Sequence, residues 1–519
     1  MFNVVLLSLF ITLVLSDSSR LWPSPQEVTF GDYTVRLDSN FQFDSSSYND
    51  ILAGALERYH NFIKFYSVDT VDDKAPMATV STVHVKPGDL NAPLEYGMDE
   101  SYTIKVYTSS VFITSNTIWG CLRALETFSQ LVESSPSHGL LIRSCPITVT
   151  DSPRWSWRGL LIDTARHYLP VRSIKKVIDS MSYVKMSVLH WHLVDAQSFP
   201  LVLPSQPDLA GKGAFRKDLV YDPATVKEII AYAKTRGIMV IPEIDVPGHA
   251  YSWGFSDPDL IAKCPSRFQS NVNNYPLNPS NPKTFSVLKN IAKDMKSLFN
   301  VTWLHLGADE PNFKCWEEDP DVAKWMKEEG LKGGADVYRF FWEQALPIFS
   351  EYRTILWQEA VLLGANPPKT SLIHVWEGLA NVKKIVSQGY DILTSAGFYL
   401  DRQQPTDKER YGFIDTWRDM FEVEPLTGLT ETEQKRLKGG EAAMWGESVD
   451  AFSIESRIWP RALAVAERLW FELKGDIDWK YEANRLERHR CRMVGRGVIA
   501  GPIVPGPPIC KFSVKPYVV

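Results

Sequence analysis

The chain has 519 residues, with 56 lysines and arginines against 62 aspartates and glutamates and a formal net charge of −6. This balance leaves no basic face for DNA or RNA, so we expect no nucleic-acid partner. The length exceeds what one hydrophobic core supports, and we therefore expect two domains, one of them large.

The first 16 residues have the pattern of a secretory signal peptide. Apolar residues fill most of the stretch 4–15, which is too short to span a bilayer and is followed at once by polar residues. Val14 and Ser16 are the small residues that precede a cleavage site. No later stretch offers about 20 consecutive apolar residues. We expect a signal peptide over 1–16, no membrane span in the mature protein, and entry into the secretory pathway.

Residues 17–152 have the pattern of a smaller α+β domain. The stretches 102–106 and 111–114 are strand-like, and a helix is predicted near 117–132. This region contains no motif that indicates chemistry. No low-complexity linker follows it, so we expect it to pack directly on the next domain.

Residues 153–519 alternate short apolar runs with amphipathic helical stretches. One helix begins with Asp222 as N-cap and Pro223 in its first turn and ends at Gly237, and another is predicted over 453–470. The eight strand-like runs are 158–164, 188–194, 239–245, 303–310, 354–359, 372–377, 391–397 and 440–447. Eight such units in about 320 residues predict an α/β fold, a (β/α)8 TIM barrel with a C-terminal tail, preceded by the smaller α+β domain.

Polar and aromatic side chains stand at the end of each predicted strand. The C-terminal ends of barrel strands face the active site. One terminal acid is usually a helix cap or part of an ion pair, but a full ring of such residues indicates catalysis. The ring consists of Asp163, Arg166, His190, His192, Asp195, Glu243, Asp245, His249, Asp309, Glu310, Trp357, Gln358, Glu359, Trp376, Glu377, Tyr399, Asp401, Trp445 and Glu447.

Two kinds of chemistry could use this ring. His190 and His192 alternate along one strand and share a face, and together with His305, His374 and the carboxylates they would suit a metallohydrolase. His305 and His374 stand well before their strand ends, however, which favours a role in filling the barrel interior. The alternative is a glycosidase, which needs carboxylates and no metal. A handful of the 17 tryptophans and 20 tyrosines would then stack against sugar rings.

The sequence His-Leu-Gly-Ala-Asp-Glu at 305–310 resembles the signature of family 20 glycoside hydrolases, the β-N-acetylhexosaminidases. The resemblance continues in order over nearly the whole barrel, through 158–168, 190–195, 247–249, 357–359 and 440–447. It is closest to the lysosomal type of animals and protists. The resemblance implies a glycan substrate, no metal and no cofactor, a lysosomal or secreted enzyme, and a homodimer.

The resemblance also implies roles for individual residues. Glu310 would be the general acid and later the base, and Asp309 would hold the 2-acetamido group of the substrate. Tyr399 would bond the acetamido oxygen, while the pair His249 and Asp195 would orient and tune the acid. The residues implied to bind the sugar are Arg166, Trp357, Trp376, Asp401, Trp445 and Glu447.

The chain departs from the family pattern in two places. Ala308 stands where glycine is frequent, and Ala196 stands where a second aspartate often follows Asp195. Neither departure removes a reacting group. Asp401 followed by Arg402 mixes features that accompany neutral and anionic substrates in the animal enzymes, so the sequence leaves the tolerance for sulfated or sialylated sugars open.

The spacing of the acids bears on the mechanism. A conventional retaining glycosidase places its nucleophile about 5–5.5 Å from the acid, on the opposite face of the sugar. Asp309 and Glu310 are adjacent and enter the site from one side. The substrate's own acetamido oxygen can replace the missing nucleophile, forming an oxazolinium ion. Together with this spacing, the resemblance implies an exo-acting, retaining β-N-acetylhexosaminidase that releases terminal GlcNAc or GalNAc from glycoconjugates or chitin oligomers. The rival from another class is a sugar-binding barrel without activity.

Six cysteines and one glycosylation sequon are consistent with an oxidising compartment. Cys264 and Cys315 follow the third and fourth predicted strands, which are neighbours, so we predict that they are bridged. Cys491 and Cys510 should close the C-terminal tail, and a third pair between the remaining cysteines, Cys121 and Cys145, stays open. Asn300, in Asn-Val-Thr, is a candidate for N-glycosylation.

Overall fold

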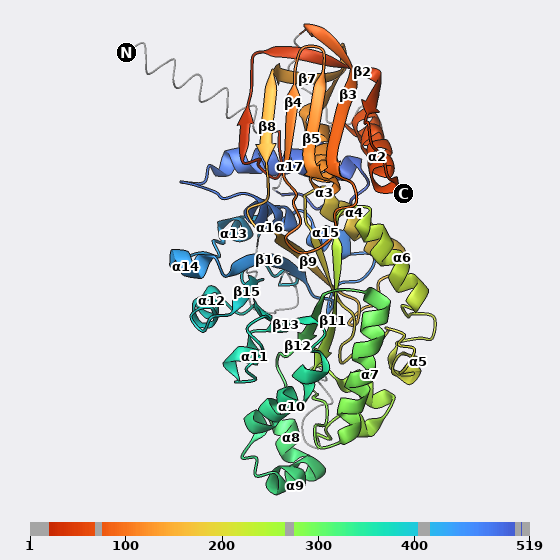
Figure 1. Cartoon of the computed structure of the whole chain (residues 1–519), viewed down its shortest axis with the longest axis vertical. Helices are drawn as coiled ribbons and strands as arrows, with labels where there is room; N and C mark the ends of the chain where they lie inside the picture. The colour runs from red at the N-terminus through yellow and green to blue at the C-terminus, as the bar shows by residue number, and fades with distance from the viewer. Residues whose placement is uncertain (1–19, 68–74, 265–274, 403–415, 504–509, 511–519) are drawn as a thin grey trace.

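A computed structural model of the chain describes residues 20–67, 75–264, 275–402, 416–503 and 510. The predicted signal peptide and its cleavage site lie outside these residues. Figure 1 shows a β-sheet domain at one end of the molecule and a barrel ringed by helices below it. This confirms the predicted fold class, a TIM barrel preceded by a smaller α+β domain. Among the described residues, no helix has the length and apolar character that crossing a membrane requires.

The N-terminal domain is an eight-stranded mixed sheet whose strand order is β1-β8-β4-β5-β3-β2-β7-β6. Two helices pack on it, α2 (Asp50–Tyr66) and α3 (Ile118–Leu131), and each begins where a side chain, Asn49 or Thr117, accepts a hydrogen bond from a backbone N–H of the first turn. The strands are β1 (Glu27–Thr29), β2 (Tyr33–Asp44), β3 (Ala78–Asp89), β4 (Tyr102–Val106), β5 (Val111–Thr117), β6 (Val132–Ser135), β7 (Gly139–Cys145) and β8 (Ile147–Asp151). The sequence predicted β4, β5 and α3 and missed the other strands.

The second domain is a closed barrel of eight parallel strands in the order β10-β11-β12-β13-β14-β15-β16-β9. All eight predicted runs form strands of this barrel. The strands are β9 (Trp157–Asp163), β10 (Val188–His192), β11 (Met239–Val246), β12 (Trp303–Gly307), β13 (Arg353–Trp357), β14 (Leu372–Val375), β15 (Asp391–Thr394) and β16 (Leu437–Met444). The predicted ends at 310, 397 and 447 were too late, because the chain already turns into the loops of the site.

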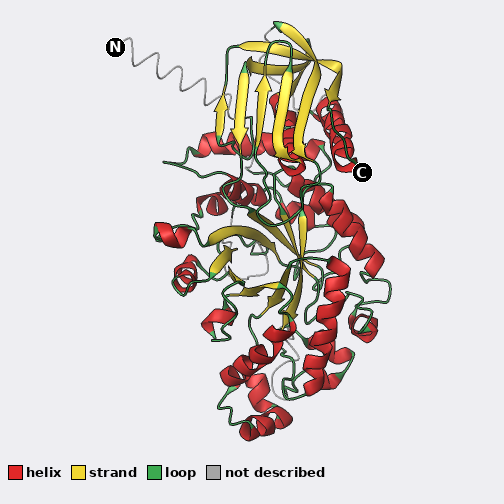
Figure 2. Cartoon of the chain, in the orientation of Figure 1, coloured by secondary structure: helices red, strands yellow, loops and turns green. Residues whose placement is uncertain are grey.

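Helices follow the strands and ring the barrel (Figure 2). They are α4 (Val171–Ser182), α5 (Pro207–Gly213), α6 (Pro223–Lys234), η1 (Tyr251–Phe255), η2 (Pro258–Leu260), α7 (Pro282–Phe299), α8 (Phe313–Glu318), α9 (Pro320–Glu328), α10 (Gly334–Ile348), α11 (Glu359–Leu362), α12 (Leu379–Val386), α13 (Trp417–Glu422), α14 (Glu431–Gln434), α15 (Ile454–Ile458), α16 (Arg461–Trp470) and α17 (Trp479–Gly495).

Two of these helices test sequence predictions. Helix α6 begins as predicted, with the Asp222 side chain accepting from the backbone N–H of Thr225 and Pro223 in the first turn. The single helix predicted over 453–470 was wrong. It is divided into α15 and α16 because Pro460 cannot continue a helix and forces the preceding Trp459 into an extended conformation.

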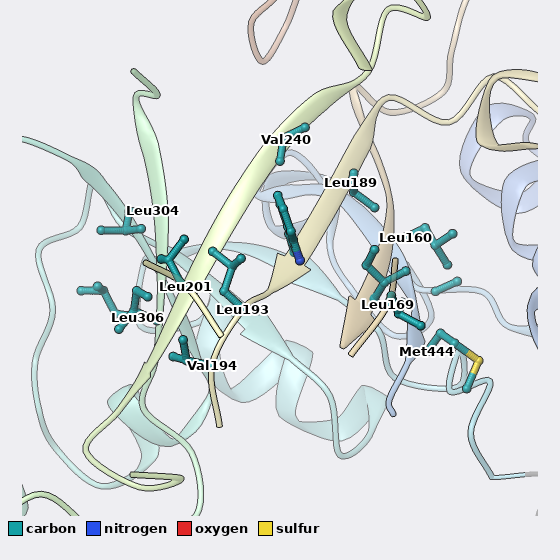
Figure 3. Close-up of a cluster of buried hydrophobic side chains, with 14 of the residues drawn as sticks. Leu160, Leu169, Leu189, Leu193, Val194, Leu201, Val240, Leu304, Leu306 and Met444 are labelled. Carbon is teal, nitrogen blue, oxygen red and sulfur yellow. The ribbon is translucent and has the colours of Figure 1, made fainter. Parts of the chain in front are cut away.

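The barrel strands bury both faces. Outward-facing residues such as Leu160, Leu189, Val240 and Leu304 pack beneath the surrounding helices (Figure 3). Inside, an apolar layer that includes Trp157 and Trp303 closes the floor of the barrel. A layer of buried histidines and glutamates lies above this floor, and the aromatic side chains of the site lie above the histidines.

Buried ion pairs join the two domains. Glu100 of the N-terminal domain accepts hydrogen bonds from Arg158 Nη2 at 2.6 Å and from Arg123 Nε at 2.8 Å. The C-terminal helix α17 lies between the sheet and the barrel in Figure 1, and Arg496, directly after its last residue, pairs with Glu126 of α3 at 2.7 Å. The sheet therefore rests on the N-terminal ends of the barrel strands and leaves their C-terminal ends open.

Candidate active site

A cavity of about 150 Å³ opens at the C-terminal ends of the barrel strands. Its walls contain every predicted catalytic and sugar-binding side chain except Asp195, which lies directly behind them. The lining residues are Arg166, His249, Asp309, Glu310, Trp357, Trp376, Tyr399, Asp401, Trp445 and Glu447. Residues 281 positions apart in the sequence thus meet in one small pocket because the barrel closes.

A tight turn after β12 presents Asp309 and Glu310. Gly307, Ala308 and Glu310 all have positive φ angles, +70°, +94° and +43°. A Cβ at Gly307 would overlap the carboxylate of Asp245, so only glycine fits there. Hydrogen bonds from the backbone N–H of Ala308 to Val246 and from the Tyr338 hydroxyl to the Ala308 carbonyl fix the turn, at 2.9 and 2.8 Å. Asp309 is therefore buried, whereas the Glu310 side chain is 45% exposed.

His249 stands between the two acids and Asp195. Its Nδ1 lies 3.1 Å from Asp195 Oδ1, and its Nε2 lies 3.5 Å from Asp309 Oδ2 and 3.7 Å from Glu310 Oε2. Burial opposes a charge on this ring, but Asp195 and the neighbouring acids raise the pKa of His249 well above its usual value. The interaction with His249 in turn lowers the pKa of Glu310.

Asp309 shares its buried surroundings with Asp245 at the end of β11. Burial raises the pKa of Asp309, and burial together with the charge of Asp309 raises the pKa of Asp245 well above its usual range. Two carboxylates this close cannot both ionise easily. Asp245 stands among the strand-end acids of the sequence, where it had no assigned role, and the structure places it beside Asp309.

Arg166 is the centre of charge on one side of the pocket. Its guanidinium pairs with Asp163 and Asp195 at 3.0 Å each, and it lies 3.7 Å from Glu447. It also lies 5.0 Å from the ring centroid of Trp445. This arrangement holds donors toward the pocket and supports the ring of Trp445.

Two glutamates, the buried Glu243 and the half-buried Glu359, hold the other two tryptophans of the wall. The indole N–H of Trp357 donates to Glu243 at 3.0 Å, and that of Trp376 donates to Glu359 at 3.0 Å. Burial raises the pKa of Glu359 to about 8. The sequence placed both glutamates at strand ends but gave them no role, because nothing in a single sequence pairs an indole with a distant carboxylate.

Tyr399 and Asp401 come from the loop after β15. Tyr399 is 8% exposed, and its ring lies 6.1 Å from that of Trp376. Burial raises the pKa of Asp401 to about 6. The Arg402 guanidinium lies 4.9 Å from the Tyr399 ring centroid.

The histidines at the level below the pocket bear on the metal alternative. His192 has one ring nitrogen 2.5 Å from Glu243 and the other 2.7 Å from Asp195, and His190 lies 2.8 Å from Glu441 and 3.1 Å from Glu243. Carboxylates thus already face both nitrogens of each ring. His305 and His374 are buried in the barrel interior, as predicted, and His305 stacks on His190 with centroids 4.6 Å apart.

The cysteines form the two predicted bridges, Cys264–Cys315 and Cys491–Cys510. The third pair that the sequence left open is not formed, because Cys121 and Cys145 are separate buried thiols. Cys315 belongs to α8, directly after the turn of Asp309 and Glu310, so the first bridge ties this turn to the neighbouring loop. Asn300 is exposed and ends α7 in a left-handed conformation, with φ at +47°.

A TIM barrel whose strand ends gather an adjacent carboxylate pair, an arginine and three tryptophans in one small pocket has the features of a glycoside hydrolase. Comparison with known proteins identifies the family. The chain belongs to glycosyl hydrolase family 20: the model of the family's catalytic domain matches residues 155–473, and a model described as beta-acetyl hexosaminidase like matches residues 21–131.

Relatives are similar over nearly their whole length. The chain is 38% identical to the beta-hexosaminidase subunit beta of Homo sapiens over 509 residues, 94% of this chain and 89% of that protein. It is 35% identical to the beta-hexosaminidase subunit A1 of Dictyostelium discoideum, covering 93% and 90%. Its fold matches the chitobiase of Flavobacterium johnsoniae with a TM-score of 0.81 at 28% identity, covering 93% and 74%. The protein is a glycoside hydrolase, a β-N-acetylhexosaminidase.

Proposed function

We propose that the enzyme is an exo-acting, retaining β-N-acetylhexosaminidase that uses the acetamido group of its substrate as the nucleophile. One observation carries this proposal. Asp309 and Glu310 lie on one turn and approach the same nitrogen of His249, at 3.5 and 3.7 Å, so they meet a sugar from one side. A carboxylate nucleophile would have to approach from the opposite face of the anomeric carbon.

In the first step, Glu310 donates its proton to the glycosidic oxygen while the acetamido oxygen attacks C1 and the bond to the leaving group breaks. A substrate lying over Glu310 removes water from this carboxyl, which raises its pKa and favours the protonated form. Asp309 accepts the acetamido N–H and stabilises the positive charge of the oxazolinium ion. The Tyr399 hydroxyl donates to the acetamido oxygen and aligns it.

In the second step, Glu310 accepts a proton from a water molecule, whose oxygen attacks C1 from the side that the leaving group has left. The acetamido group is regenerated, and two inversions give net retention. His249 and Asp195 orient Glu310 through both steps. Arg166, Asp401 and Glu447 bind ring hydroxyls, and the three tryptophans enclose the sugar. The small pocket supports release of one terminal GlcNAc or GalNAc from glycoconjugates or chitooligosaccharides.

A chromogenic GlcNAc glycoside assay, with and without a chelator, tests the proposal against its rivals. We expect turnover that the chelator does not change. No turnover would favour a sugar-binding barrel without activity, and turnover lost to the chelator would favour the metallohydrolase.

Two variants test the roles of the acids. Glu310→Gln removes the transferable proton. It should slow the hydrolysis of natural glycosides by ~10²–10⁴-fold, the contribution of a positioned general acid, and that of activated nitrophenyl glycosides by less.

Asp309→Asn should lower kcat far more than it raises KM. Glycosides with a 2-hydroxyl in place of the acetamido group should be nearly inert, and a thiazoline mimic of the oxazolinium ion should inhibit tightly. A covalent sugar ester trapped on any carboxylate would overturn the mechanism.

The cellular setting belongs to the same proposal. A secretory route ending in a lysosome or outside the cell is consistent with the apolar N-terminus, the disulfides and the exposed sequon at Asn300. A homodimer is expected from the family resemblance. Sedimentation at assay concentrations tests it, and a monomer there would contradict it.

A further inference from the structure

A continuous series of carboxylates and imidazoles runs from the catalytic pair into the barrel interior. Asp195 lies against His249 at the level of the pocket, His192 follows at 2.7 Å, Glu243 at 2.5 Å from His192, and His190 at 3.1 Å from Glu243. All five side chains are buried. The order of the contacts makes Glu243 the point where the site joins the barrel interior.

His192 must carry two ring protons in this arrangement. Its Nε2 faces Asp195 Oδ2 and its Nδ1 faces Glu243 Oε2. Ionised carboxylates only accept hydrogen bonds, so both nitrogens have to donate. Charge-assisted bonds of this kind are roughly twice as strong as neutral ones, and they fix the Asp195 carboxylate beneath His249. The pKa of His192 is raised well above its usual value: burial opposes the charge, but Glu243 and Asp195 outweigh it.

Glu243 also holds a wall of the pocket. Its other oxygen, Oε1, accepts the indole N–H of Trp357 at 3.0 Å and lies 2.9 Å from His305 Nδ1 in the barrel interior. An indole nitrogen can only donate, and in the described structure no second acceptor is found for this N–H. The two oxygens of Glu243 therefore have different roles. Oε1 holds Trp357 in the pocket wall, and Oε2 holds His192 against Asp195.

We propose that Glu243 is a positioning residue of the reaction, which locks Trp357 against the substrate and holds His192 doubly protonated beneath Asp195 and His249. The proposal rests on the function proposed above, in which Trp357 encloses the sugar and His249 orients Glu310.

Replacing Glu243 by glutamine separates its two tasks. Glutamine has one accepting oxygen and one donating amide nitrogen. Because Trp357 can only donate, the amide oxygen should turn toward Trp357, and the amide nitrogen should then face His192 Nδ1. His192 must give up that proton and becomes neutral. Glu243→Gln should therefore keep the sugar-binding wall but loosen the support of Asp195 and His249.

Glu441 on β16 provides a matched control. It is equally buried, it also accepts an indole N–H, from Trp157 at 2.6 Å, and it also contacts His190, at 2.8 Å. Trp157 belongs to the floor of the barrel, and Glu441 does not line the pocket. Glu441→Gln thus repeats the same chemical change at the far side of His190, on a residue that does not line the pocket and does not contact His192 or Trp357.

The experiment compares kcat, KM and the unfolding midpoint of the full-length wild type, Glu243→Gln and Glu441→Gln on a GlcNAc nitrophenyl glycoside. For Glu243→Gln we expect kcat to fall by about 10- to 100-fold, the scale of a small misplacement of a catalytic group, with KM changed by less than about threefold. Glu441→Gln should lower the unfolding midpoint by about as much as Glu243→Gln lowers it. It should leave kcat within about threefold of wild type.

Equal losses of kcat in both variants, measured where both are folded, would mean that Glu243 has only a structural role and would overturn the proposal. An unchanged kcat in Glu243→Gln would overturn it as well. If Glu243→Gln does not fold, the pair Glu243→Asp and Glu441→Asp carries the same test, with a loss of kcat/KM expected only in the former. An inactive wild type, or an active Glu310→Gln, would instead refute the proposed function.

Discussion

At the scale of single residues, the site contains acids whose environment penalises their charge. Asp401 is the case in which the consequence for stability can be measured. Burial raises its pKa from the ordinary 3.8 to about 6. Between these two values the folded state binds more protons than the unfolded state, so folding loses stability as pH rises through this window.

Asp401→Asn should remove this penalty. The variant should be about 2 kcal/mol more stable than wild type at pH 7, should gain progressively less from pH 6 down to pH 4, and should gain almost nothing at pH 4. Urea unfolding at pH 4, 5 and 7 measures the difference. A gain independent of pH would show that the carboxyl is not the source. Loss of a proposed hydroxyl contact should raise KM in the same variant.

At the scale of elements, the loops after β11 and β12 are fastened to each other. The bridge Cys264–Cys315 closes a loop of 51 residues beside the catalytic turn. The Trp316 indole N–H, donating to the Leu277 carbonyl at 2.8 Å, adds a second fastening between the same two segments. The turn that carries Asp309 and Glu310, proposed to be catalytic, therefore lies on a loop with little freedom to move.

Replacing Cys264 and Cys315 together by serine should lower the free energy of unfolding by about 4 kcal/mol, the loop-closure value for this length. The pair Cys491–Cys510 is the control. Its loop spans only 19 residues and comes later in the chain than every residue that lines the pocket. Its double serine variant should lose about 3 kcal/mol and leave kcat unchanged. Denaturant unfolding and kinetics test both. A larger loss in the control would contradict the loop-closure account.

At the scale of the whole molecule, Glu100 is the centre of one of the buried charge clusters that join the sheet domain and the barrel. Glu100 is 2% exposed and lies between Arg123, on its own domain, and Arg158, at the start of the first barrel strand. The two guanidiniums overcome the burial of this carboxyl and lower its pKa. This end of the strand is opposite the pocket, so the cluster can affect stability without touching catalysis.

Glu100→Gln leaves two buried guanidiniums without a countercharge and should cost about 3–5 kcal/mol of unfolding free energy while leaving KM unchanged. Because the cluster bridges both domains, calorimetry should still record one transition at a lower temperature. Asp218→Asn, which breaks an exposed pair with Arg216, should have no measurable effect. Two separate transitions in Glu100→Gln, with the barrel unchanged, would mean that the domains unfold independently.

How much the sequence predicted differs between local and distant features. The alternation of apolar runs and amphipathic helices was enough to predict the eight barrel strands. The residues at the ends of these strands were enough to predict which side chains line the pocket. The break at Pro460 was visible in the sequence and was overlooked. The early end of β12 was not visible, because residue type alone would not place Ala308 at a φ of +94°.

The sequence by itself therefore determined the class of fold, the strand-end residues that gather in the pocket and the two cysteine pairs that form, since periodicity and the nature of strand ends are local properties of the chain. Only the tertiary structure decided which partners these groups have. Glu441 meets His190 across 251 residues because the last strand closes against the first. Glu243 on β11 meets Trp357 on β13 across 114 residues because the side chains of both strands point into the barrel interior. Burial raises the pKa of Asp401, and the carboxylates of Glu243 and Asp195 raise that of His192 against its burial. Both effects depend on elements that meet only once the barrel is closed.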